Sequence, residues 1–87
     1  MSTKTFSVIP IEGGWAVEAA RGEQLMFLSG GRAEAKAKQL AQLAGKLGDT
    51  AQVLIHDRDG RLIGKRLYPA EDAREAQARR PVLNLSR

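Results

Sequence analysis

Residues 31–47, GRAEAKAKQLAQLAGKL, decide the fold of this 87-residue chain. Apolar side chains recur there at alternating steps of four and three residues, which places them on one face of an α-helix. The stripe consists of Ala33, Ala37, Leu40, Ala44 and Leu47. Ala41 and Leu43 widen it, and Glu34 and Lys38 are spaced for an ion pair across one helical turn. Such a helix needs an apolar layer to lie on, and the rest of the sequence is typical of strands.

Three short strands are predicted before the helix. Residues 5–11 alternate as a strand does, and the paired glycines in residues 12–14 are typical of a tight turn. Residues 15–20 return as a second strand with Trp15, Val17 and Ala19 on one face. The short apolar run of residues 25–28 is a third strand, and Ser29 or the following glycines cap the helix. The first half is therefore predicted to be a meander.

Two further strands, residues 51–57 and 61–68, are predicted after Gly48 ends the helix. Asp59-Gly60 between them indicates a hairpin. A three-residue loop with a left-handed Gly60 sets Ile55 opposite Ile63 and Asp57 opposite Arg61, whereas a two-residue loop shifts the pairing by one. We favour the longer loop because it gathers more apolar surface toward the helix. The face toward the helix then holds Val53, Ile55, Ile63 and Leu67, with Lys65 at its margin.

The opposite face of this hairpin is half apolar. It holds Leu54, His56, Leu62, Arg66 and Tyr68. Two interpretations stay open: a contact surface for a second copy or another protein, or the ordinary exposure of apolar atoms on a small domain.

The predicted fold class is α+β, an antiparallel β-β-β-α-β-β arrangement followed by a C-terminal helical or disordered tail. Residues 1–68 form the compact domain and residues 69–87 the tail, in which Pro69 opens an alanine-rich and charged segment that runs to Arg80. Whether the five strands form one sheet is left open by the sequence.

Composition excludes several classes of protein. The chain has no cysteine, hence no disulfide and no thiolate metal site, and no apolar run of membrane-spanning length. A signal peptide is not apparent, so we expect a cytoplasmic protein without a membrane partner. The net charge of +4 is a mild excess, and taken alone it favours an ordinary surface over nucleic-acid binding.

Catalytic chemistry has little to build on. His56 is the single histidine, and its neighbour Asp57 points to the other face of a strand, so it cannot readily orient the imidazole. The glycines before Arg32 lie at a helix start, where backbone N–H groups hold anions, but no phosphate-binding motif surrounds them. We predict no enzyme, no catalytic residue, no cofactor, no metal and no small-molecule substrate.

The best candidate surface for DNA or RNA is the basic side of the second hairpin. It consists of Arg58, Arg61, Lys65 and Arg66, extended by Lys36 and Lys38 of the helix if these lie nearby. The sequence thus predicts a small non-enzymatic binding module, associated with nucleic acid through this hairpin. The alternative is a self-associating or protein–protein interaction domain, such as a homodimer, with no role in nucleic-acid binding.

Two motifs together resemble a known family. Val8-Ile9-Pro10 with Gly13-Gly14-Trp15-Ala16-Val17, and later residues 53–62, VLIHDRDGRL, are similar to the prokaryotic domain of unknown function 2188. The resemblance covers about residues 5–68. It implies a compact strand–helix–strand domain in a prokaryotic protein, and it implies no catalytic residue.

Overall fold

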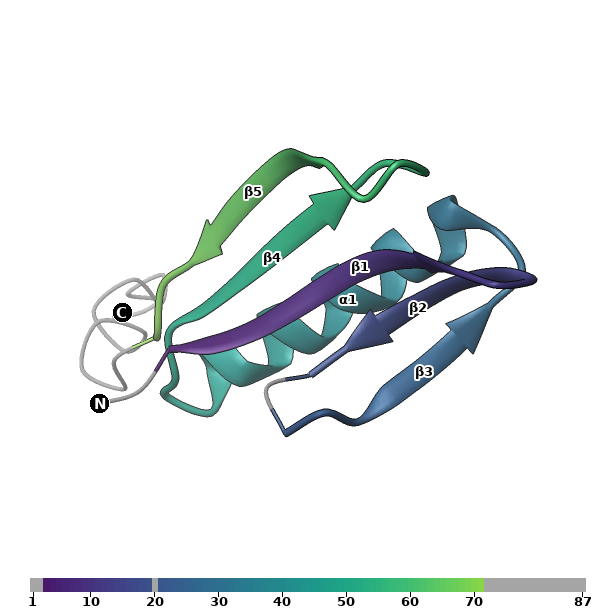
Figure 1. Ribbon diagram of the computed structural model, residues 1–87. Helices are drawn as coiled ribbons and strands as arrows, with labels where there is room; N and C mark the ends of the chain where they lie inside the picture. Colours follow the sequence, from purple (N-terminus) through teal and green to yellow (C-terminus); the bar gives the residue numbers. More distant parts are fainter. Residues whose placement is uncertain (1–2, 20, 72–87) are drawn as a thin grey trace, which may run out of the picture.

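The computed structural model describes residues 3–19 and 21–71, which form a five-stranded sheet with one helix on it (Figure 1). The strands are β1 (Lys4–Ile11), β2 (Gly14–Glu18), β3 (Gln24–Phe27), β4 (Ala51–His56) and β5 (Leu62–Tyr68), and the helix is α1 (Gly30–Lys46). All five strands belong to a single sheet in the order β3-β2-β1-β4-β5. The predicted α+β class and the order β-β-β-α-β-β are confirmed, as is the meander.

One strand pair departs from the predicted antiparallel arrangement. The two central strands, β1 and β4, pair in parallel, so the sheet is mixed. The reason is the helix between β3 and β4. At about 1.5 Å per residue, α1 spans the full length of a strand. It therefore returns the chain to the end of the sheet where β1 begins, and β4 runs beside β1 in the same direction.

The core is a seam of alanines against valines. The buried residues include Ala33, Ala37, Ala41 and Ala44 of α1, and Val8, Val17 and Val53 of the sheet. Small side chains let the helix lie close to the strands, while the valines fill the layer beneath it. Half-buried aromatic side chains, among them Phe6, Trp15 and Phe27, pack around this cluster. Trp15 and Val17 lie on one face of β2, as the alternation predicts, and this is the face toward the core.

The predicted helix stripe is wrong at its C-terminal end. Leu47 is 72% exposed and Leu43 52% exposed, whereas Gly45 is buried. Gly45 takes the inner position because the chain that follows β5 lies against it: the Glu71 N–H donates to the Gly45 carbonyl at 2.8 Å. The expected pair of Glu34 with Lys38 is also absent, since the single ion pair among the described residues joins Lys4 Nζ to Asp49 at 3.2 Å.

Both predicted ends of the helix are confirmed. Ser29 is the N-cap, and its hydroxyl accepts a hydrogen bond from the Arg32 N–H at 3.2 Å. At the other end Gly48 is left-handed, with φ of +94°. The N–H groups of Gly48 and Asp49 donate to the carbonyls of Gly45 and Ala44, which is a Schellman ending.

The second hairpin has the predicted loop but a different register beyond it. Gly60 is left-handed, and the Asp57 N–H donates to the Arg61 carbonyl at 2.9 Å, as the three-residue loop requires. A bulge then intervenes, so that Ile55 pairs with Gly64 and not with Ile63. Because one extra residue reverses the faces, Gly64, Arg66 and Tyr68 lie on the helix side, while Lys65 and Leu67 lie on the other. The predicted faces of β5 were therefore wrong beyond the bulge, whereas Leu62 lies beside His56 as predicted.

The described chain ends at Glu71, beside the last turn of α1. The helix predicted up to Arg80 falls on residues 72–87 and so lies outside the described residues. Among the residues that the structure describes, no helix has the length and apolar character needed to cross a membrane.

Candidate interaction surface

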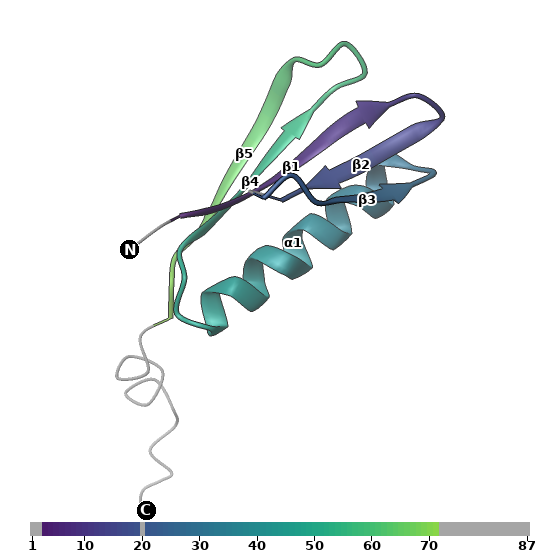
Figure 2. The ribbon, with the colours of Figure 1, turned by 60° about the horizontal axis from the view of Figure 1, so that its bottom comes forward.

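The helix covers one face of the sheet, and no described element covers the other (Figure 2). We call this second face the open face. Strand pairing assigns its members, because residues opposite a helix-facing residue in a neighbouring strand face the helix too, and their immediate neighbours in sequence face away. Its apolar members on the strands include Ile9, Ile11, Ala16, Met26, Leu54 and Leu67.

The apolar side chains of the open face are linked by direct and diagonal neighbours. Ala16 pairs with Ile9 on one side and Met26 on the other, and it is fully buried although no described helix lies above it. On the far side of β1, Leu54 is diagonal to Ile9 and Leu67 is diagonal to Leu54. Met26 is 71% exposed and Leu67 is 60% exposed, so large apolar groups stand in water at both edges.

Charge is sparse on the open face. Glu18 of β2 and Lys65 of β5 are the two charged strand residues that its described part holds. Its amide and hydroxyl groups partly satisfy one another, since Gln52 Nε2 donates to Thr5 Oγ1 at 2.9 Å. Glu18 accepts a hydrogen bond from Gln24 Nε2 at 3.1 Å. The strands thus present about as many polar as apolar side chains on this face, with one acid and one base.

His56 lies on the open face, where its ring is engaged by the backbone. Its Nδ1 is 3.0 Å from the Val8 carbonyl oxygen, which only accepts, so Nδ1 carries the proton. This bond satisfies a carbonyl just where the pairing of β1 with β4 ends. No group of three His, Cys, Asp or Glu side chains within residues 3–19 and 21–71 is placed to hold a metal ion.

The six predicted nucleic-acid-binding residues are not gathered on one surface. Lys65 is on the open face, whereas Arg66 is on the helix side of β5, with its guanidinium 5.6 Å from the centre of the Tyr68 ring. The Arg58 guanidinium is folded over Trp15, 5.7 Å from the ring centre. Arg61, three residues further along the chain, is exposed at the base of the hairpin loop.

The two helix lysines lie on opposite flanks of α1. Lys36 shares a depression with Phe27 of β3, which is the edge of the sheet away from β5, and it donates to Gln39 Oε1 at 3.2 Å. Lys38 is two residues further, about 200° around the helix. The expected extension of the basic hairpin onto the helix therefore cannot include both lysines. Residues 3–71 carry ten Lys and Arg against eight Asp and Glu, so the described domain is close to balanced in charge.

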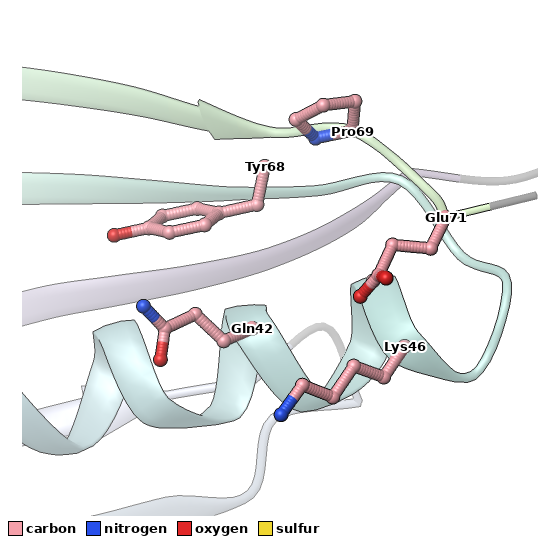
Figure 3. A pocket seen from close by; sticks show the side chains of 6 residues that line it. Gln42, Lys46, Tyr68, Pro69 and Glu71 are labelled. Atoms are coloured by element: carbon pink, nitrogen blue, oxygen red, sulfur yellow. The ribbon is translucent and has the colours of Figure 1, made fainter. Parts of the chain in front are cut away.

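A groove lies between the end of α1 and the end of β5 (Figure 3). Gln42, Lys46, Tyr68, Pro69 and Glu71 line it, and the Tyr68 ring hangs from β5 above Gln42. Lys46 and Glu71 form no ion pair across it. The groove is open and lacks a cluster of convergent ionisable groups, so it offers no evident acid–base chemistry.

The sequence alone placed Leu54, His56 and Leu62 together on one face, but it did not place Glu18 or Leu67 with them. The available signal was alternation within each strand. It puts Ser7, Ile9 and Ile11 on one face of the first strand, and Ala16 and Glu18 on one face of the second. What it could not supply was the order of the strands, which joins these stripes into one surface.

Comparison of the chain with protein-family models, with curated proteins and with solved structures gives no match. The resemblance to the domain of unknown function 2188 accordingly stays a prediction.

Proposed function

We propose that this chain is a non-enzymatic protein-interaction module of the prokaryotic cytoplasm, and that the open face of its sheet is the working surface. One observation carries the proposal. The apolar side chains of Ile9, Leu54, Met26 and Leu67 lie on the side of the sheet opposite α1, where none of the described elements covers them. Apolar surface of this kind is stabilised by removal from water, and on soluble domains it is a common mark of protein contact sites.

The non-enzymatic part rests on how the ionisable groups are used. The single histidine donates to a backbone carbonyl, and the Asp57 carboxylate accepts hydrogen bonds from the N–H groups of Asp59 and Arg61, both at 2.9 Å. These groups stabilise the hairpin rather than converge on a cavity. A catalytic site needs an acid or base directed at a substrate, and the described residues offer no such group.

Contact with nucleic acid through the basic hairpin has less support than protein contact. Arg58 and Arg61 remain near the tip of the hairpin, but Lys65 and Arg66 lie on opposite faces and the domain is nearly balanced in charge. Phosphate-driven binding gains most from a concentrated basic patch. That surface stays a prediction from the sequence.

Cysteine accessibility tests the proposal, because the chain has no cysteine of its own. Leu62→Cys places one thiol on the open face, and Leu43→Cys places one on α1, at a position of matched exposure: 54% for Leu62 and 52% for Leu43. We expect a maleimide to label both thiols equally in the purified protein at about 1 μM. A weak contact is dissociated at this concentration, so the open face is free. In cells of the native host, the thiol of Leu62→Cys is expected to be labelled at least about fivefold more slowly than that of Leu43→Cys, because a protein covers it.

The comparison is internal, since both variants experience the same reagent and the same cytoplasm. Unfolding curves of the two variants confirm that each thiol is presented by a folded domain. Equal labelling of the two thiols in cells would overturn the proposal, because it would show that the open face remains in water where the protein works.

A further inference from the structure

The charges of the open face lie in one row across the sheet. Glu18 of β2 pairs with Ser7 of β1, Ser7 pairs with Leu54 of β4, and Leu54 pairs with Lys65 of β5. Four adjacent strands thus place an acid and a base at equal distances from the boundary between β1 and β4. Three strand spacings, about 14 Å, separate the two, so they cannot pair within one chain.

We infer that the protein covering the open face is a second copy of this chain, related by a twofold axis that runs along the boundary between β1 and β4. This inference rests on the proposed working surface. Rotation about that axis turns the face over and exchanges the two sides of the boundary. Glu18 of each copy then lies opposite the partner's Lys65, and two equivalent ion pairs form.

The spacing of packed sheets suits this pairing. Two sheets lie about 10 Å apart face to face, a gap that a Glu and a Lys side chain span together. Between the two ion pairs, the side chains of Ser7 and Leu54 meet across the axis, with Ile9 beside them. The dimer therefore buries Leu54 and Ile9, with Ser7 and His56 between them, at its centre, and it places its charges toward the sides.

Charge favours a second copy over other partners. A nucleic acid or an acidic peptide would meet a single lysine on this face, together with an acid of the same charge sign as itself. Two copies meet with both charges matched. With this axis β2, β1, β4 and β5 of the two copies overlap, and β3 lies outside the overlap. The overlap measures about 19 Å by 20 Å, if four strands lie about 4.8 Å apart and about six residues of each take part. This plane of about 380 Å² is smaller than the roughly 800 Å² per partner of a standard interface, which points to a weak, reversible dimer.

Exchange of the two charges tests the arrangement by sedimentation equilibrium of the full chain over about 1–500 μM, a range suited to a small reversible interface. We expect the wild-type protein to form a dimer. Glu18→Lys and Lys65→Glu are each expected to weaken it about tenfold, because each puts like charges together twice. The double variant with both changes is expected to recover most of the wild-type affinity.

The two single variants separate a local pair from a general charge effect. Lys65→Glu lowers the net charge from +4 and Glu18→Lys raises it. A general effect would therefore strengthen association in the first and weaken it in the second, whereas the local pair weakens both. Lys36→Glu, on the helix, is the control with the same charge change as Lys65→Glu. Circular dichroism and urea unfolding establish that each variant is folded.

Each outcome of the sedimentation experiment supports or overturns a stated part of the inference. A dimer in which the single variants shift in opposite directions, or in which the double variant stays weak, would overturn the stated axis. A wild-type monomer at every concentration, or an assembly larger than a dimer, would overturn the inference that a second copy closes the face. If the chain were monomeric while the thiol of Leu62→Cys was protected in cells, the proposed working surface would stand and its partner would be a different protein.

Discussion

At Gly14 of β2, the backbone of β3 lies so close that no side chain fits between the two strands. A Cβ atom built on it would lie against the backbone carbonyl oxygen of Phe27, closer than atoms of real side chains come. The absence of a side chain therefore allows β3 to pair with the first residues of β2. The glycine pair of the first turn is thus used twice, since Gly13 is left-handed in the turn while Gly14 makes room for a strand.

Gly14→Ala is accordingly expected to lower the free energy of unfolding by about 2 kcal/mol, because either β3 or the first turn must shift. Gly31→Ala is the matched control. Its added Cβ meets nothing within 4 Å, and in a helix alanine is favoured over glycine, so we expect a gain of about 0.5–1 kcal/mol. Urea unfolding followed by circular dichroism measures both. Equal stabilities of the two variants would contradict the close approach.

Among the elements, the helix depends on alanine as much as on its apolar period. Ala33, Ala37 and Ala41 are all completely buried, and no larger side chain of α1 is. The leucines that the period places with them lie at the margin or in water. Contact of the helix with the valines of the sheet is close for this reason, and the layer has little free volume for a larger group.

Ala37→Leu is therefore expected to destabilise the domain by about 1–3 kcal/mol, through overpacking beneath the helix. Ala35→Leu makes the same chemical change at an exposed position of the same helix and is expected to alter the free energy of unfolding by less than about 0.5 kcal/mol. Thermal and urea unfolding compare the two. A result in which Ala35→Leu is the more damaging change would show that the seam faces another way.

Local chemistry explains which elements the sequence revealed. Glycine and Asp-Gly turns, the serine cap and the left-handed Gly48 act over a few residues, and the structure confirms each of them. The bulge near Ile63 was not predicted, because a loop sets the register only up to the first irregularity. The burial of Gly45 was not predicted either, because it depends on a contact with Glu71, which is far along the chain.

At the scale of the whole molecule, α1 packs on one face of the sheet, and none of the other described elements covers the opposite face. The sequence indicated half of this face, in Leu54, His56 and Leu62, but it assigned Arg66 there in place of Lys65. The complete face required the parallel pairing of β1 with β4, a non-local contact that no single stretch of sequence encodes. That pairing also brings Glu18 and Lys65 into one row, on which the proposed dimer depends.

The most direct test of the open face as a self-association surface is the dilution of methyl-labelled protein, followed by NMR. From about 500 μM to 5 μM, a range that brackets a weak dimer of this size, the methyl resonances of Leu54 and Leu67 are expected to move along one binding curve. Those of Leu43 and Leu47, which are exposed on α1, are expected to stay in place. Shifts confined to the helix leucines, or no shift in any methyl group, would contradict the account.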